Sequence, residues 1–223
     1  MMNKNMFYLL YAILIIKFLI FGCQKVIQEP KKAVVNFIIG EVKLDNQPAK
    51  IGETVKNQSI ITTGANSIAE IKFGKHSGIQ IRENSKVEVK MDQSGWNIVT
   101  YKGAILNLIE PGTKFKLHGP SSVIAIRGTI FYVHCYEDHT QYICTCNGVI
   151  DIEDGQQVNK TVSASHHKGY TVNKSDTGQV FVSAPMKEHT DLEIFEFMYR
   201  IEHSSEVDGS EINFNENKKA GLF

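Results

Sequence analysis

Apolar and polar residues alternate along most of this chain, between about residues 34 and 182. The clearest two-residue periods occur at 42–44, 69–73, 79–82 and 87–90. In an extended chain this period places successive side chains on opposite faces, as in half-buried strands. Similar strand-like runs follow at 97–101, 104–109, 114–118, 123–126, 129–136, 141–146, 149–153, 160–164 and 179–182. The pattern therefore predicts many short strands.

Turn-forming residues separate the earlier runs, and their spacing indicates the fold class. They occur at 45–48, 63–66, 74, 83–85 and 93–95. Gly and Asn at these points tolerate the positive φ that tight turns require. We predict an all-β domain over residues 34–183, built as a multi-stranded antiparallel roll, a sandwich or a solenoid. No sequence repeat of fixed length is present to demonstrate a regular array.

One segment near the carboxyl end, residues 186–203, has a helical period instead. Its apolar residues mostly recur every three or four positions, and acidic residues lie toward its start. This arrangement predicts an amphipathic helix whose dipole is complemented at its amino end. Residues 204–223 are polar and rich in Asn, Glu and Lys, so we expect a flexible tail.

The first 22 residues have the pattern of an export signal. Eleven apolar residues run from Met6 to Ile16 between Lys4 and Lys17, too few for the roughly 20 that cross a bilayer. The Gly-Cys ending at Cys23 resembles a bacterial lipoprotein signal, in which that cysteine is the site of lipid attachment. An uncleaved amino-terminal helix is the alternative anchor. Residues 23–33 are polar and are expected to form a tether, which places the domain outside the cytoplasm on a membrane.

Composition and charge exclude several classes of protein. The chain is 42% hydrophobic, with 24 basic and 24 acidic residues. That composition excludes collagen-like, coiled-coil and wholly disordered chains. Residues after 22 carry two more acidic than basic residues, since Lys4 and Lys17 lie in the leader. We expect no nucleic-acid partner, because binding phosphates needs a basic face. No nucleophile elbow, phosphate-binding loop or H-E-x-x-H motif is present, so no enzyme is expected.

Short motifs occur in a characteristic order and together resemble a FecR domain over residues 38–153. They lie at 40–42, 51–55, 60–64, 69–71, 78–85, 101–103, 126–131 and 148–152. The most specific is the core Arg127-Gly128-Thr129-x-Phe131. The resemblance implies an exported, non-catalytic all-β domain that binds a protein or ligand at an envelope surface. The family's namesake relays receptor occupancy to a sigma factor, but only about five residues precede the apolar run, so we do not expect direct sigma-factor control.

The family-motif residues also have structural interpretations. Gly128 permits a bulge or a close approach of two backbones. The guanidinium of Arg127 offers five hydrogen-bond donors, which suit it to locking a corner of the fold. We favour this role for Arg127 over ligand binding.

A second set of residues, which the family resemblance does not predict, combines thiols with imidazoles. Cys135 ends one expected strand, and Cys144 and Cys146 lie in the next. Cys144 and Cys146 point to the same face of an extended strand, and the hairpin is expected to place Cys135 about opposite Cys144. His166 and His167 follow and can both be ligands only in a turn. Five scattered histidines are expected to be solvated or locally hydrogen-bonded: His76, His118, His139, His189 and His203.

Three interpretations of the cysteines and histidines are open. Cys144 and Cys146, with Cys135 or with His166 and His167, can form a tetrahedral zinc site or a softer Cu(I) site. Export instead favours a disulfide from Cys135 to Cys144 or Cys146. A bond between Cys144 and Cys146 is disfavoured, because such positions in a strand lie roughly 6.6–7 Å apart. The third interpretation is inert buried thiols and surface histidines.

The sequence thus predicts a membrane-anchored envelope lipoprotein whose FecR-like domain is a non-catalytic binding, scaffold or sensing module. A protein partner in the envelope is expected. The alternative is a metal-binding or redox-responsive protein that uses the cysteine and histidine residues.

Overall fold

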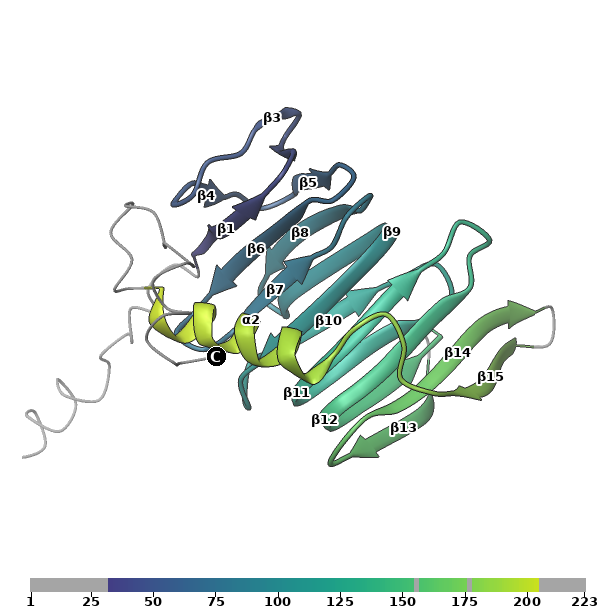
Figure 1. Ribbon diagram of the computed structural model, residues 1–223. Helices are drawn as coiled ribbons and strands as arrows, with labels where there is room; N and C mark the ends of the chain where they lie inside the picture. The colour runs from purple at the N-terminus through teal and green to yellow at the C-terminus, as the bar shows by residue number, and fades with distance from the viewer. Residues whose placement is uncertain (1–31, 155–156, 176–177, 205–223) are drawn as a thin grey trace, which may run out of the picture. The chain divides into compact units, whose positions relative to one another are not determined.

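The computed structural model describes residues 32–154, 157–175 and 178–204, and Figure 1 draws their arrangement. The predicted leader, Cys23, the tether up to residue 31 and the tail from 205 lie outside the described residues. Within the described ranges, no helix has the length and apolar character needed to cross a membrane. The all-β prediction is confirmed, with one carboxy-terminal helix.

The described residues form fifteen strands and one helix. The strands are β1 (Ala33–Ile39), β2 (Val42–Leu44), β3 (Gln47–Pro48), β4 (Thr54–Val55), β5 (Ser59–Thr63), β6 (Ile68–Phe73), β7 (Gly78–Ile81), β8 (Lys86–Asp92), β9 (Gly95–Ile109), β10 (Phe115–His118), β11 (Val123–Cys135), β12 (Gln141–Glu153), β13 (Val158–Ala164), β14 (Lys168–Ser175) and β15 (Gly178–Ala184). The helix is α2 (Asp191–His203). Thr190 caps it, so it begins five residues after the predicted start.

All strands belong to one hydrogen-bonded sheet. Its main path runs β15-β14-β12-β11-β10-β9-β7-β6-β1-β4, with β13 paired to β12. A second branch joins β9 to β8, β8 to β5, β5 to β2 and β2 to β3. Neighbours are antiparallel, except that β10 runs parallel to β9. The sheet is therefore mostly a set of meanders that share the long strand β9.

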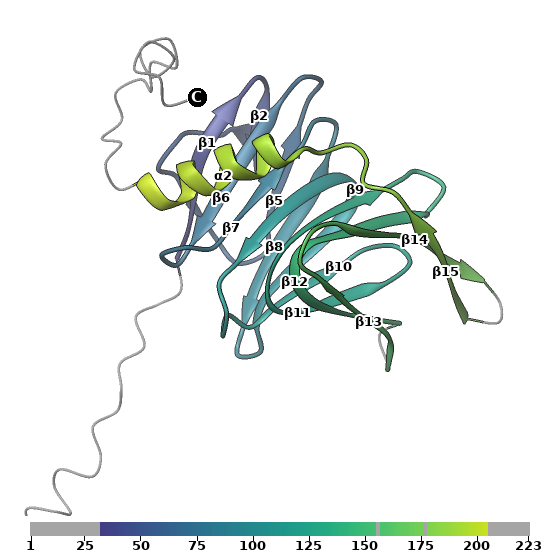
Figure 2. The ribbon, with the colours of Figure 1, turned by 60° about the horizontal axis from the view of Figure 1, so that its bottom comes forward.

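Three long strands, β9, β11 and β12, change partners along their length. The first part of β9 pairs with β8 and β10, and its second part pairs with β7 and β11. Each long strand contains a glycine with positive φ, 86° at Gly103, 96° at Gly128 and 110° at Gly148. Because glycine adopts this conformation without steric cost, the strands bend there. Figure 2 shows the strands curling round an enclosed interior.

That interior holds the main hydrophobic core. Its centre is a row of aromatic side chains, Phe73, Trp96, Phe115 and Phe131, with neighbouring ring centroids 4.9–6.3 Å apart. Phe131 of the family motif is fully buried in this row. The row explains why a phenylalanine occupies the end of the motif.

The other family-motif residues shape the bend of β11. A Cβ atom on Gly128 would lie 2.7 Å from Cα of Pro111, so only glycine allows this approach. The hydroxyl of Thr129 accepts from the backbone N–H of Val149 at 2.8 Å and donates to its carbonyl at 3.0 Å. The side chain of Arg127 lies outside the described part of the chain, so its predicted role stays a prediction.

Helix α2 covers a second, smaller apolar layer on the outer face of the sheet. Ile194, Phe197 and Ile201 are its buried residues. They pack in a cluster with Leu106 and Tyr132 of the strands beneath. Figures 1 and 2 show the helix lying across the strands rather than along them. The amino end of α2 therefore lies above β11 and β12, and its carboxyl end lies toward β6 and β7.

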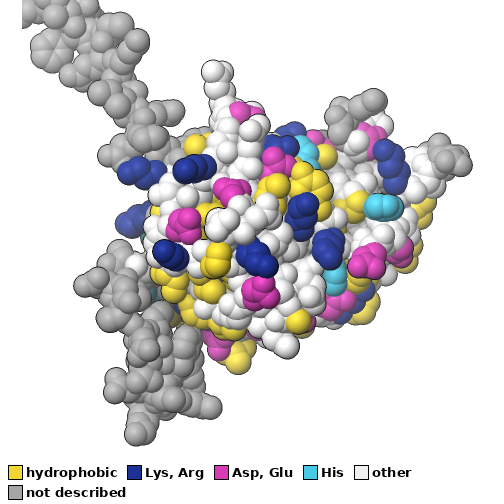
Figure 3. Space-filling model, turned by 90° about the horizontal axis from the view of Figure 1, so that it is seen from above, with side chains coloured by type: hydrophobic (Ala, Val, Ile, Leu, Met, Phe, Trp, Pro, Cys, Tyr) yellow, Lys and Arg dark blue, Asp and Glu magenta, His cyan; other side chains and the backbone are white. Residues whose placement is uncertain are grey.

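On the face of the molecule seen in Figure 3, basic and acidic side chains are interspersed. Proteins that follow a phosphate backbone gather their Lys and Arg residues into a stripe or patch. The face shown has no such stripe among its described residues.

Candidate metal centre

Two cysteines and two histidines converge beside the amino end of α2. One ligand atom from each of Cys144, Cys146, His167 and His189 lies within 4.8 Å of the other three. Cys144, Cys146 and His189 are buried residues, with exposed fractions of 0%, 5% and 4%. His167 is partly exposed as a residue, but its side chain is only 6% exposed. Buried thiols and imidazoles in one cluster are typical ligands of a soft or borderline metal ion.

The two cysteines come from one strand, as their spacing predicts. Both lie in β12 and point toward the layer under α2, together with Tyr142. The strand there is paired on one side with β11 and on the other with β14. The backbone that carries the two sulfur atoms is consequently held on both edges.

His167 lies in the turn between β13 and β14, so both neighbouring histidines can face the same side. Its Nδ1 lies 3.6 Å from Sγ of Cys144, and its Nε2 donates to Asp191 at 2.7 Å. The adjacent His166 is exposed and lies 3.3 Å from the other oxygen of Asp191. Because a carboxylate only accepts, Nε2 carries the proton in the neutral ring of His167, and Nδ1 then has its lone pair toward the cluster.

His189 is the member that the sequence did not predict. It was expected to be solvated or locally hydrogen-bonded. It does bond locally, to Lys187, but it is buried and stacks on Tyr132 with the ring centroids 4.5 Å apart. Its Nδ1 donates to the carbonyl of Lys187 at 2.8 Å, and its Nε2 lies 3.4 Å from Sγ of Cys146. A carbonyl cannot donate, so the lone pair of Nε2 faces the cluster.

The segment before α2 is fixed against β11 and β12, which places His189. Glu188 has a φ of +65° and accepts a hydrogen bond from Tyr136 at 2.7 Å. The hydroxyl of Tyr142 donates to the carbonyl of Pro185 at 2.9 Å. His189 also directly precedes the helix cap, in which Thr190 and Glu193 bond reciprocally. That capping box was legible in the sequence and is the signal that fixes His189 at a helix start.

The distances within the cluster agree with tetrahedral coordination. Zinc bonds of about 2.3 Å to sulfur and 2.0–2.1 Å to nitrogen give a sulfur–nitrogen edge of about 3.6 Å in a tetrahedron. The two sulfur–nitrogen contacts measure 3.6 Å and 3.4 Å. These two of the six ligand–ligand distances thus match a tetrahedral metal ion, and all four ligand atoms lie within 4.8 Å of one another.

The electrostatics of the cluster favour a thiolate. Hydrogen bonding with Cys146, followed by the bonds to His189 and His167, lowers the pKa of Cys144 against the opposing effect of burial. The same contact with Cys144, together with burial, raises the pKa of Cys146. Burial opposes the imidazolium of His167, but Asp191 and Cys144 outweigh it and raise its pKa. One of the two thiols, Cys144, therefore ionises readily. Ionisation of Cys146 beside it needs a cation that balances the second negative charge.

Cys135 does not belong to this cluster. It pairs with Gln141 rather than lying opposite Cys144, whose partner is Tyr132. It also points into the main core, on the opposite face of the sheet from Cys144. A bond between those two cysteines is therefore excluded in this fold, and the three described cysteines are free thiols. Burial raises the pKa of Cys135 to about 12, so it is a neutral, apolar side chain.

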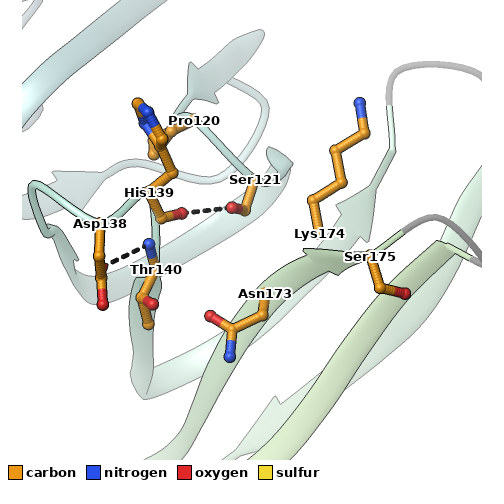
Figure 4. Close-up of a pocket in the computed structure, with 8 residues that line it drawn as sticks. All are labelled: Pro120, Ser121, Asp138, His139, Thr140, Asn173, Lys174 and Ser175. Carbon is orange, nitrogen blue, oxygen red and sulfur yellow. Dashed lines mark hydrogen bonds between the residues drawn. The ribbon is translucent and has the colours of Figure 1, made fainter.

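A separate open pocket of about 560 Å³ lies between the β11–β12 turn and the β14–β15 hairpin. Figure 4 shows its polar side chains, and those of Asp138 and His139 point away from each other. Asp138 accepts from the N–H of Thr140 at 2.9 Å, and Ser121 donates to the carbonyl of His139. These groups stabilise the turns and do not converge as a nucleophile and its base.

Comparison with known proteins identifies the domain. The family model described as FecR protein matches residues 59–150. The chain contains a FecR domain. Two crystal structures of a proposed anti-sigma factor from Parabacteroides distasonis ATCC 8503, at 1.65 and 2.50 Å resolution, are similar at 10% identity with a TM-score of 0.48. Each similarity covers 57% of this chain and 60% of that chain. A search of curated proteins found no match.

The candidate metal centre lies across the boundary of the FecR match. Cys144 and Cys146 lie inside residues 59–150, whereas His167 and His189 lie beyond them. The thiols belong to the FecR domain, and both imidazoles come from the chain that follows it.

Proposed function

We propose that this protein is a non-catalytic, zinc-binding FecR-domain protein that senses or binds its partners at the bacterial cell envelope. The observation that carries the proposal is the convergence of Cys144, Cys146, His167 and His189 within 4.8 Å. The FecR domain supports a regulatory role with a protein partner.

Zinc fits the cluster better than other metals. A tetrahedral set of two sulfurs and two nitrogens is characteristic of zinc, and four protein ligands without an open position are typical of structural rather than catalytic sites. Both imidazoles also donate their outer N–H to an oxygen, at Asp191 and at Lys187, which is the usual support for zinc-bound histidine. Cys144 and Cys146 are poorly placed to oxidise to a disulfide, so they remain ligands in an oxidising compartment.

A lipid on Cys23 is the proposed anchor of the domain. The apolar leader and its Gly-Cys ending support export and lipidation. Acyl chains contribute about 0.8 kcal/mol for each methylene buried in the bilayer, enough for two or more chains to hold a domain on the membrane. Radioactive fatty acid should label the wild-type protein, and Cys23→Ala should lose the label. Equal labelling of both proteins would exclude this anchor.

Metal analysis tests the zinc site directly. The full chain, purified reduced and dialysed against zinc, should hold one zinc ion per chain by elemental analysis. Cobalt in its place should show the thiolate charge-transfer absorption of a tetrahedral site. The double variant Cys144→Ser with Cys146→Ser should lose both signals. The matched control is Cys135→Ser, which changes a buried thiol on the other face and should retain them.

Two results would overturn the zinc proposal. One is a folded, reduced wild-type protein that holds no zinc after dialysis. The other is stoichiometric zinc in the double variant, since the metal would then lie elsewhere.

A further inference from the structure

The ligands of the candidate metal centre come from two parts of the chain that are far apart in sequence. Cys144, Cys146 and His167 belong to the β12–β14 region of the sheet. His189 belongs to the segment that leads into α2, 43 residues after Cys146. A metal ion bound to all four would therefore join the start of α2 to the sheet.

The first residues of α2 are coupled directly to the same ligands. Asp191, the first residue of the helix, binds His167 on the side opposite Cys144. Thr190, which follows His189, caps the helix through its reciprocal bonds with Glu193. The start of the helix is consequently coupled to the positions of the imidazoles of His167 and His189.

At its other end, α2 is held by contacts that need no metal. Glu70, which is fully buried, pairs with Arg200 at 2.7 Å. Lys72 donates to the carbonyl of Ile201 at 2.6 Å, in the last turn of the helix. Between the two ends, three apolar side chains face the sheet, while Leu192 and Phe195 are exposed at 61% and 57%. A helix of 13 residues is marginal in water by itself, so most of the stability of α2 comes from its packing on the sheet.

We propose that zinc at this centre is a latch that holds α2 on the FecR domain, so that metal occupancy sets how firmly the helix docks. This inference rests on the proposed function. In the zinc-bound state the helix covers the apolar face that includes Leu106, Tyr132 and Tyr142. When the metal is removed, the amino end of α2 keeps its ion pair between Glu193 and Arg82 at 3.1 Å but loses the link through the metal, and that face is uncovered more often. The latch thus converts loss of the metal into exposure of an apolar surface beside the sheet.

Hydrogen exchange measured by mass spectrometry on the reduced, full-length chain tests the latch. The zinc-loaded and chelator-treated proteins are compared at the amides of α2, with β5, which pairs with β2 and β8, as an internal control. Zinc at 100 times its dissociation constant favours the bound state by about 100-fold. We expect α2 amides to exchange at least about tenfold more slowly with zinc, and β5 amides to be unchanged.

The variant His189→Gln separates the latch from the metal site. It removes the ligand on the helix side and leaves Cys144, Cys146 and His167 on the sheet. We expect it to bind zinc more weakly, with α2 exchange that no longer depends on zinc. His203→Gln, in the last turn of α2, is the control and should behave as wild type.

Each outcome decides between the two proposals. If one zinc ion binds per chain and the amides of α2 exchange equally fast with and without zinc, the latch is refuted and the zinc site stands. Zinc-dependent protection that persists in His189→Gln also refutes the latch. If the wild-type protein binds no zinc, both proposals fail.

Discussion

Replacement of a single phenylalanine under α2 tests the link between helix docking and metal affinity from the opposite direction. Phe197 is fully buried between the helix and the sheet, and Phe195 on the same helix is 57% exposed. If zinc favours the docked helix, then a change that weakens docking must also weaken zinc binding, by at most the coupling free energy that links the two equilibria. We therefore predict that Phe197→Ala lowers the affinity for zinc although Phe197 is not a ligand.

The magnitude follows from the burial of the ring. Truncation of a buried phenylalanine to alanine costs about 3–5 kcal/mol. Part of this cost lowers the stability of the docked helix without releasing it. The rest weakens zinc binding, and each 1.4 kcal/mol raises the dissociation constant about tenfold. Cys144, Cys146 and His167 still bind, which limits the loss. We expect the zinc dissociation constant to rise about 10–100-fold.

Competition with a chromophoric chelator measures these dissociation constants. Phe195→Ala is the matched control, because an exposed side chain of the same kind on the same helix is removed. Exposed substitutions usually change stability by less than about 0.5 kcal/mol, so its affinity should stay within about twofold of wild type. The reasoning is refuted if Phe197→Ala binds zinc as tightly as wild type while hydrogen exchange shows that its helix is released.

Three further substitutions test contacts that shape the fold. Gly78→Ala should destabilise the protein by about 1–3 kcal/mol, because the new Cβ would lie 2.9 Å from the backbone carbonyl oxygen of Ile71 and 2.6 Å from Cδ1 of Ile201 in α2. Arg200→Met should cost about 3–5 kcal/mol, since it leaves the buried carboxylate of Glu70 without its cation. Thr129→Val should cost about 1–3 kcal/mol, because it removes the hydroxyl that binds both polar groups of a backbone residue across the β12 bend. Urea unfolding measures all three.

Matched variants show which of these effects are specific. Gly64→Ala has room for its Cβ, with the nearest atom at 3.4 Å, and should leave stability nearly unchanged. Glu196→Gln removes only a distant partner of Arg200, at 3.9 Å on the surface, and should cost less than about 1 kcal/mol. A loss for these controls as large as for their partners would show that the named contacts are not the cause.

The alternating pattern was sufficient to predict the fold class, because half-buried strands impose their period on the sequence. It was not sufficient to predict how the strands continue. Residues 97–101 and 104–109 were expected to be separate strands, but they form one strand that bends at Gly103. A glycine with positive φ occurs both in turns between strands and in bulges within one strand, and the sequence looks the same in both cases. Only its neighbours in space, here Ser85, show which of the two it forms.

The candidate metal centre was predictable where its ligands are local and not where they depend on tertiary structure. The same-face placement of Cys144 and Cys146 follows from strand geometry alone. The expectation that Cys135 lies about opposite Cys144 was wrong, because Cys135 pairs with Gln141 and faces the other side of the sheet. His189 gave no periodic signal. Its burial depends on the path of the chain from β15 to α2, which local sequence does not encode.

The four candidate ligands are divided between the FecR domain and the chain that follows it, and this division bears on what the site could do. A domain limited to residues 59–150 would carry the two thiols but neither imidazole. The proposed four-ligand site would therefore form only when the chain beyond β12 adds its three strands and returns across the sheet as α2. A structural zinc ion inside one domain would stabilise that domain whatever the rest of the chain did. A site completed by His189 would instead make metal affinity depend on where the carboxy-terminal helix lies, and a sensing module requires such a dependence.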